Sequence, residues 1–122
     1  MDVENIYRRS GSSWIMVYQN YQALSVTADP VIVFQPAGFI TTVGGSSTAN
    51  TTGGKGTITY SWTHREGTVL NVTGAGTKTA YFSYNFPSHG GTVWSTYRVT
   101  VSDGISSAYV NVSINLSLGS PL

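Results

Sequence analysis

The acidic side chains are the first to consider for chemistry, because paired carboxylates can act as general acid and base. The chain has five of them, Asp2, Glu4, Asp29, Glu66 and Asp103. A glycosidase needs two carboxyl groups held roughly 5–10 Å apart. Asp29 and Asp103 precede Pro and Gly in predicted turns, where an Asp side chain bonds the nearby backbone. Glu66 is the one acid expected in a loop that could face a substrate, and no partner for it is evident.

Metal and nucleophile chemistry have little support in the sequence. A zinc site needs three or four protein ligands, so it would require both His64 and His89 together with a carboxylate. The absence of cysteine excludes disulfides, thiolate ligands and a Cys nucleophile. There is no G-x-S-x-G elbow, and the glycines around Lys55 lack the context of a phosphate-binding loop. We therefore predict no enzyme activity, no metal and no cofactor.

Aromatic side chains offer a binding function instead. Trp14 and Trp94 could stack on sugar rings, with Asn and Thr side chains as hydrogen-bond partners. Trp94, beside the flexible pair Gly90–Gly91, is the best candidate for a glycan contact. The alternative is that most aromatic side chains lie in the core, as we expect for Trp62. A carbohydrate-binding module therefore stays open as an alternative function.

The composition sets the class of protein. The 122 residues suit one domain, which can bury a core without metal or disulfide staples. Only 9% of the residues are charged and the net charge is +1, so we expect no nucleic-acid partner. No apolar run approaches the ~20 residues of a membrane span, so we expect no membrane insertion. The acidic start, Met1–Glu4, does not resemble a signal peptide.

The second half of the chain has the clearest strand patterns. Apolar and hydroxyl side chains alternate along 93–102 and again along 108–118, and Asp103-Gly104 between them is a hairpin turn signal. This alternation is typical of an antiparallel sheet with one buried face. Tyr97 and Val99 fall on the buried face of the first of these strands.

The first half has shorter strand candidates. Apolar runs at 23–28 and 31–34 flank an Asp-Pro turn, and a third candidate at 39–43 is expected to end at Gly44-Gly45. Trp62 lies on a predicted strand of alternating aromatic and hydroxyl residues. A turn is expected after this strand, at Glu66-Gly67. Further short strands are predicted at 69–72 and 79–86.

Seven or more short strands predict an all-β fold, an immunoglobulin-like antiparallel β-sandwich. Trp62 is expected in its core beside Tyr97 and Val99. Val99 stands where a true immunoglobulin domain has its second Cys, and Tyr97 stands at the tyrosine-corner position, whose hydroxyl caps a loop backbone.

Two sequence blocks carry a resemblance to a known family. GGKGTITYSWT at 53–63 and YRVTVSDG at 97–104 resemble the Ig-like modules of bacteriophage tail and tail-fibre proteins. The second block is also similar to the end of PKD domains. The match covers about 38–118 and aligns 47–52 with strand B. PKD domains tend to carry acidic residues after the Trp, where this chain has His64-Arg65-Glu66, so the resemblance implies no acidic site.

The N-terminal segment, residues 1–22, is predicted to be a hairpin or extension separate from the Ig-like domain at 23–122. Two apolar runs flank a Ser/Gly loop at 10–13, and the second run is apolar on both faces. One explanation is a hairpin packed on its own domain. The other is a virion anchor that contacts another virion protein or a symmetry mate; its predicted assembly contacts are Trp14, Ile15, Met16 and Val17.

The resemblance implies a non-enzymatic structural protein of a bacteriophage or prophage virion. We expect an Ig-like module of the tail, baseplate or fibre apparatus, assembled in the host bacterial cytoplasm, with a structural or adhesive role. Its expected partners are other virion proteins or symmetry mates, and a host-surface glycan if the module is adhesive. A capsid decoration protein is the structural alternative, and a carbohydrate-binding module is the binding alternative.

Overall fold

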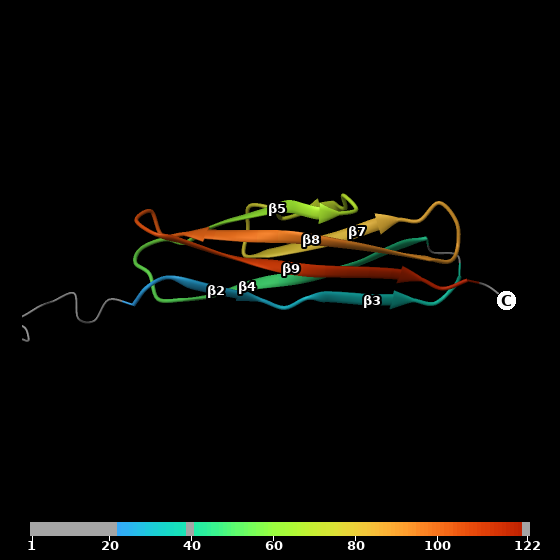
Figure 1. Cartoon of the computed structure of the whole chain (residues 1–122), viewed down its shortest axis with the longest axis horizontal. Helices are drawn as coiled ribbons and strands as arrows, with labels where there is room; N and C mark the ends of the chain where they lie inside the picture. The colour runs from blue at the N-terminus through green and yellow to red at the C-terminus, as the bar shows by residue number, and fades with distance from the viewer. Residues whose placement is uncertain (1–21, 39–40, 121–122) are drawn as a thin grey trace, which may run out of the picture.

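The computed structural model describes residues 22–38 and 41–120, and this part of the chain forms eight strands. They are β2 (Ser25–Ala28), β3 (Val31–Gln35), β4 (Thr42–Thr52), β5 (Thr59–Gly67), β6 (Asn71–Thr73), β7 (Thr79–Asn85), β8 (Gly91–Ser102) and β9 (Ser107–Leu118). The strands make two four-stranded sheets, in the orders β2-β4-β7-β6 and β3-β9-β8-β5, that lie face to face (Figure 1). These orders match the ABED and GFC sheets of immunoglobulin domains, with β3 added beside the last strand. The predicted immunoglobulin-like β-sandwich is confirmed.

The long hairpin of β8 and β9 forms the centre of the β3-β9-β8-β5 sheet. The two strands pair without interruption from Gly91↔Leu118 to Ser102↔Ser107. Their inward positions are apolar except for Ser95 and are buried along most of the hairpin, and their outward positions carry mainly Ser, Thr and Asn. The period-2 pattern of the sequence therefore identified the hairpin and its buried face correctly.

Strand β3 differs from the predicted antiparallel arrangement, because it pairs in parallel with β9 from Val31↔Ile114 to Gln35↔Leu118. Strand β2 belongs to the other sheet, so the chain changes sheets at Asp29-Pro30 without reversing direction (Figure 1). Since Pro has no N–H and disfavours helical geometry before it, this dipeptide suits the short crossing. The result is that β3 lies at the edge of its sheet.

Strand β4 corrects the prediction that Gly44-Gly45 ends a strand, because β4 runs through both glycines and continues to Thr52. A Cβ at Gly44 would lie 2.7 Å from the carbonyl oxygen of Phe82, and one at Gly45 would lie 2.9 Å from methyl groups of Val31 and Val33. Gly44 is therefore needed for the close approach of β4 to β7, and Gly45 for the packing of β4 against β3. The strand-B alignment at 47–52 covers only the second half of this strand.

Strand β5 corrects the prediction of a turn at Glu66-Gly67, which the structure places in the last part of the strand. The pairing with β8 shifts by one residue between His64 and Glu66, as in a β-bulge. Gly67 then pairs with Ser95 and has a φ of 78°, a conformation that favours glycine. Glu66 is therefore a strand residue at a bulge and not a loop residue.

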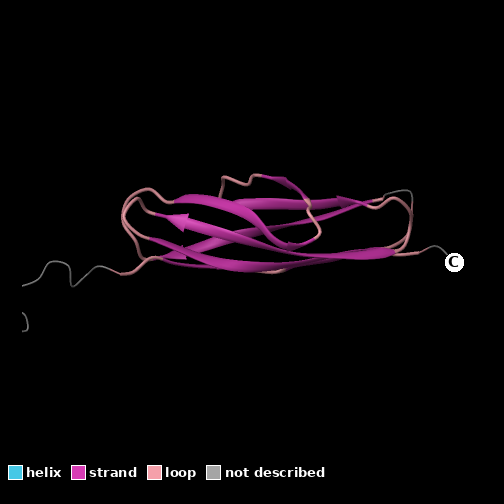
Figure 2. Ribbon diagram, turned by 45° about the horizontal axis from the view of Figure 1, so that its top comes forward, coloured by secondary structure: helices cyan, strands magenta, loops and turns pink. Residues whose placement is uncertain are grey.

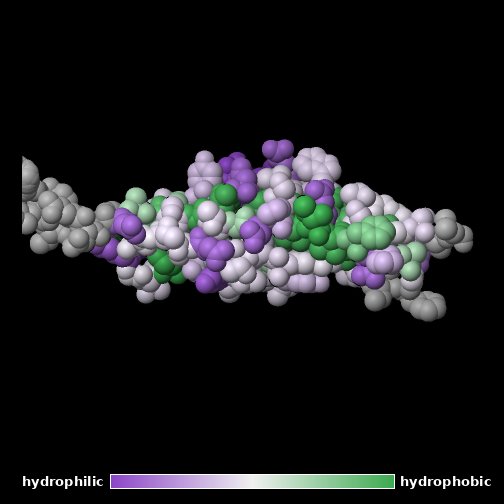
Figure 3. All heavy atoms as spheres, turned by 90° about the horizontal axis from the view of Figure 1, so that it is seen from below, coloured by the Kyte–Doolittle hydropathy of each residue, from purple (hydrophilic) through white to green (hydrophobic). Residues whose placement is uncertain are grey.

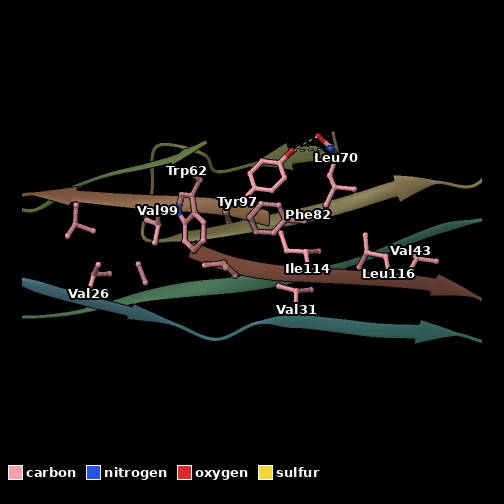
Figure 4. Packing of buried hydrophobic residues seen from close by; sticks show 14 of the residues in the cluster. Val26, Val31, Val43, Trp62, Leu70, Phe82, Tyr97, Val99, Ile114 and Leu116 are labelled. Atoms are coloured by element: carbon pink, nitrogen blue, oxygen red, sulfur yellow. Dashed lines mark hydrogen bonds between the residues drawn. The ribbon is translucent and has the colours of Figure 1, made fainter. Parts of the chain in front are cut away.

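The core between the sheets is built around three aromatic rings (Figure 4). Trp62 is 4% exposed and lies opposite Val99, which is fully buried. Its ring packs edge-on against Phe82 at 5.7 Å between centroids, and Phe82 lies 4.9 Å from Tyr97. The indole Nε1 donates a hydrogen bond of 2.8 Å to the carbonyl of Thr77. Trp62 thus fills the core and also ties β5 to the turn before β7.

The hydroxyl of Tyr97 binds a loop backbone, as the tyrosine-corner position implies. It accepts a hydrogen bond from the N–H of Leu70 at 3.0 Å and lies 3.4 Å from the Leu70 carbonyl oxygen, to which it donates. Leu70 lies in the connection between β5 and β6, so Tyr97 holds this connection against the core (Figure 4). The usual tyrosine corner binds backbone only a few residues upstream, so the partner here is a different loop.

The predicted N-terminal hairpin and its assembly contacts, Trp14 to Val17, lie outside the described residues. In the described part of the chain, no helix is long and apolar enough to cross a membrane. The strands run along the length of an elongated sandwich, whose described chain begins at one end and finishes at the other (Figure 2).

Candidate interaction surface

Asp103 is a structural acid in the turn between β8 and β9. Its carboxylate accepts hydrogen bonds from the N–H groups of Ser106 at 2.7 Å, Ile105 at 2.9 Å and Lys55 at 2.9 Å. These backbone donors lower the pKa of Asp103 from 3.8 to about 2. The carboxylate therefore fixes the turn and fastens the glycine-rich loop at 53–56 to it.

The other candidate chemical residues are spread along the surface. Glu66 is exposed and lies opposite Thr96 on β8. His64 Nε2 donates a 2.9 Å hydrogen bond to the carbonyl of Gly67, and the His64 ring packs edge-on to Tyr97. His89 bonds the carbonyl of Gly38. Among the described residues, no three His, Asp or Glu side chains come together in a group that could hold a metal ion.

Exposed apolar side chains gather on the outer face of the β3-β9-β8-β5 sheet. Ile32 on β3 lies opposite Asn115 on β9, and Asn115 lies opposite Trp94 on β8, so the three form one row across the sheet. Ile32 is 74% exposed and Trp94 is 54% exposed. The neighbouring row begins with Phe34, which is 66% exposed, and continues to Ser117 and Thr92, whose hydroxyls lie 3.0 Å apart. We call these two rows the outer patch.

The outer patch is uncharged and reaches the edge of the sheet. Its members from β3 to β8 are Ile32, Phe34, Asn115, Ser117, Trp94 and Thr92. Figure 3 views the molecule from the side on which β2 and β3 lie, and it shows a hydrophobic area over the half that contains β3. Clustered exposed apolar side chains of this kind mark sites of interaction.

A second aromatic residue, Tyr109, lies on the same face towards the other end of the sheet, but it is already engaged. The guanidinium carbon of Arg98 lies 3.9 Å from the centre of the Tyr109 ring, a cation–π distance. Arg98 also donates a 2.9 Å hydrogen bond from Nε to Oδ1 of Asn111. On this face of the described sheet, the exposed aromatic side chains without such a partner are therefore those of the outer patch, Trp94 and Phe34.

The sequence pointed to part of this surface and missed the rest. Trp94 was the candidate for glycan contact, and the structure places it on the exposed face beside Asn115. Ile32 and Phe34 were not identified, because a continuous apolar run suggests a strand buried on both faces. The missing information is the position of β3 at a sheet edge, which depends on its parallel pairing with a strand more than eighty residues away.

Comparisons with known proteins support the fold. No protein-family model matches the chain, and no curated protein matches it. Among solved structures, the chain is similar to the solution structure of the PKD domain from human KIAA0319, with a TM-score of 0.57 and 14% sequence identity. The similarity covers 92% of this chain and 96% of that one. At this identity the likeness shows the fold alone, an immunoglobulin-like β-sandwich.

Proposed function

We propose that the chain is a non-enzymatic structural or adhesive module of a bacteriophage or prophage virion, in the tail, baseplate or fibre apparatus. The observation that supports a structural role is that the motifs resembling phage Ig-like modules serve the sandwich itself. Trp62 bonds Thr77, Tyr97 bonds Leu70, and Asp103 accepts three backbone N–H groups. Since fold alone does not determine function, the virion role rests on the resemblance.

In this role, residues 1–22 anchor the module, with Trp14 to Val17 contacting a neighbouring virion protein or a symmetry mate. The test is mass spectrometry and cryo-electron microscopy of purified particles of the parent phage. We expect the chain in the particles and an Ig-like density at the tail. Density on the capsid shell would favour the decoration alternative, and a chain absent from particles but present in infected cells would reject the virion role.

A second test removes residues 1–22. We expect the truncated chain to keep a cooperative thermal unfolding transition and to be lost from particles, because the described sandwich has its own core. Val69→Lys, which adds a charge to the exposed connection between β5 and β6, is the control and should leave incorporation into particles unchanged. A truncated chain that still enters particles would place the anchor elsewhere.

The carbohydrate-binding alternative is favoured by one observation, the exposure of Trp94 beside Asn115. An indole face with a neighbouring amide can stack on a sugar ring and bond its hydroxyls. A glycan array with the intact chain, Trp94→Ala and the control Tyr109→Ala tests it. Binding that is lost with Trp94→Ala and kept with Tyr109→Ala would establish this function, and an array without binding would reject it for the glycans presented.

A further inference from the structure

The outer edge of β3 is an unusual surface for a monomeric protein. In the described part of the chain, β3 pairs with β9 on one side only, so the backbone N–H and C=O groups on its other side have no strand pairing there. Proteins commonly protect such edges with charged side chains, with Pro or with bulges. Strand β3 instead has the uncharged sequence Val-Ile-Val-Phe-Gln, and two of its apolar side chains, Ile32 and Phe34, are exposed.

A segment of the chain itself has the properties needed to cover this edge. Trp14–Tyr18 has five residues, as β3 does, and neither carries a charge. As an extended strand, the segment would have Trp14, Met16 and Tyr18 on one face and Ile15 and Val17 on the other. At this edge, apolar side chains on both faces of an added strand would be covered. One face would extend the outer patch, and the other would extend the buried side of the sheet.

The length of the chain decides whether this covering can occur within one molecule. The carbonyl of Gln22 accepts a hydrogen bond from Gly54, in the loop that Asp103 fastens to the β8–β9 turn. Gln22 therefore lies at the end of the sandwich where β9 begins. Strand β9 begins at Ser107. Ile32 lies opposite Asn115, eight residues further along β9, and Phe34 lies opposite Ser117, ten residues further along. These spans are about 27 Å and about 34 Å.

The segment is too close to Gln22 in sequence to pair with β3 along its length in its own molecule. Tyr18 is four residues before Gln22, and four residues span at most about 14 Å. Even Trp14, eight residues before it, reaches at most about 29 Å, and only with a fully extended chain. Trp14–Tyr18 therefore cannot lie along Ile32 and Phe34 of the same molecule.

We propose that Trp14–Tyr18 of one copy docks as an added strand on the outer edge of β3 in a second copy, against Ile32 and Phe34. Strand addition of this kind gains main-chain hydrogen bonds and side-chain burial together. The described chain begins at one end of the sandwich and the acceptor strand points towards the other end (Figure 1). Copies can thus join head to tail or exchange segments reciprocally. This self-association does not require the virion role, and a purified chain suffices to test it.

The first experiment measures self-association of the full chain by sedimentation equilibrium over a dilution series. We expect the wild type to associate and Ile32→Lys to weaken association by roughly tenfold or more, because an edge charge opposes strand pairing. The matched control is Val69→Lys, because Val69 is also a β-branched apolar residue and is 70% exposed. This variant should associate like the wild type. Thermal unfolding of all three checks that each is folded. A monomeric wild type, or equal association of Ile32→Lys, would overturn the proposal.

The second experiment locates the contact by disulfide formation, which is unambiguous because the chain has no cysteine. Chains with Met16→Cys or Val17→Cys, one for each face of the segment, are mixed with chains carrying Ile32→Cys. We expect one of the two mixtures to form a cross-linked heterodimer. Ile105 is the competing partner, since it is 80% exposed and lies in the turn near Gln22. If Val17→Cys and Ile105→Cys close a disulfide within one chain, the segment covers its own turn and the proposal fails.

A bound glycan is the other possible cover of the same surface, and the two experiments separate it from strand addition. A chain that stays monomeric at all concentrations and loses glycan binding on Ile32→Lys would have a sugar-binding patch and no docking strand. A chain that associates through β3 and shows no glycan binding would support strand addition and would not bear on the virion role.

Discussion

The β8–β9 hairpin and the edge strand β3 belong to one sheet but treat their outward positions differently. Along most of the hairpin, each inward apolar residue is followed by an outward Ser, Thr or Asn. Strand β3 has apolar residues at inward and outward positions alike, so Val31 is 4% exposed while Ile32 is 74% exposed. The hairpin therefore shows what the sandwich needs in order to fold, and β3 carries additional apolar surface that the fold does not use.

The difference separates two kinds of apolar residue that look alike in the sequence. Inward residues remove surface from water on folding, at about 25 cal/mol per Å² of apolar area. The outward residues Ile32 and Phe34 on β3 are exposed and gain this energy only when they are covered in turn. Substitutions at inward positions should thus change unfolding, and substitutions at outward positions should change association.

The largest effect is expected for Trp62, the central inward residue of β5. Trp62→Ala removes the ring that packs on Phe82 and leaves the Thr77 carbonyl without its indole partner. We expect a loss of about 3–5 kcal/mol in the free energy of unfolding, the range for large aromatic residues in cores. Chemical denaturation followed by circular dichroism measures it. A loss below about 1 kcal/mol, the level of a surface change, would contradict the core assignment.

The next effect concerns the close approach of β4 to its neighbours. Gly44→Ala would place a Cβ 2.7 Å from the carbonyl oxygen of Phe82, a backbone atom that cannot rotate away. We expect a destabilisation of about 1–3 kcal/mol, near the upper end, as for other overpacked sites. Gly76→Ala is the matched control, because nothing lies within 4 Å of its added Cβ. Equal stability of the two variants by denaturant unfolding would contradict the packing reason given for Gly44-Gly45.

Tyr97 tests the polar part of the core. Tyr97→Phe keeps the ring but leaves the buried N–H of Leu70 without its 3.0 Å partner. An unsatisfied buried donor costs about 1–3 kcal/mol. Tyr109→Phe is the control, because its exposed ring keeps its contact with Arg98. Denaturant unfolding of both variants should show the loss for Tyr97→Phe alone, and amide exchange at Leu70 should quicken in that variant.

The strands that the sequence predicted well are those in which local pattern and final environment agree. The alternation around Tyr97 and Val99 predicts a strand with one buried face, and β8 has one buried face. Gly44-Gly45 was misread because the need for glycine comes from Phe82 and Val31, which are distant in sequence. Glu66 was misread because a bulge keeps the strand going where the local residues favour a turn. The surface at β3 depends on topology, which periodicity does not specify.

Asp103 tests the turn that connects the two strands of the hairpin, by way of pH. Its pKa in the folded chain is about 2, below the ordinary value of 3.8, because backbone N–H groups bind the ionised form. Its stabilisation is therefore complete above about pH 5 and is lost as the pH falls through 4 towards 2. Asp103→Asn should lower the melting temperature at neutral pH, and the difference from wild type should shrink between about pH 4 and 2. A difference that stays constant over this range would show that the carboxylate charge does not matter.

The smallest effect on folding is expected on β3 itself, where two consecutive residues give a direct comparison of the inward and outward positions. Val31→Thr puts a hydroxyl into the core at a position only 4% exposed, which costs about 1–3 kcal/mol when the hydroxyl finds no partner. Ile32→Thr makes a similar change one residue later on the exposed face, so the free energy of unfolding should change by about 0.5 kcal/mol or less. Both variants keep a β-branched side chain, which separates burial from strand propensity. Denaturant unfolding at a concentration where the chain is monomeric measures both. An Ile32→Thr loss as large as that of Val31→Thr would mean that the outward side of β3 contributes to the folded monomer, and the distinction between β3 and the hairpin would fail.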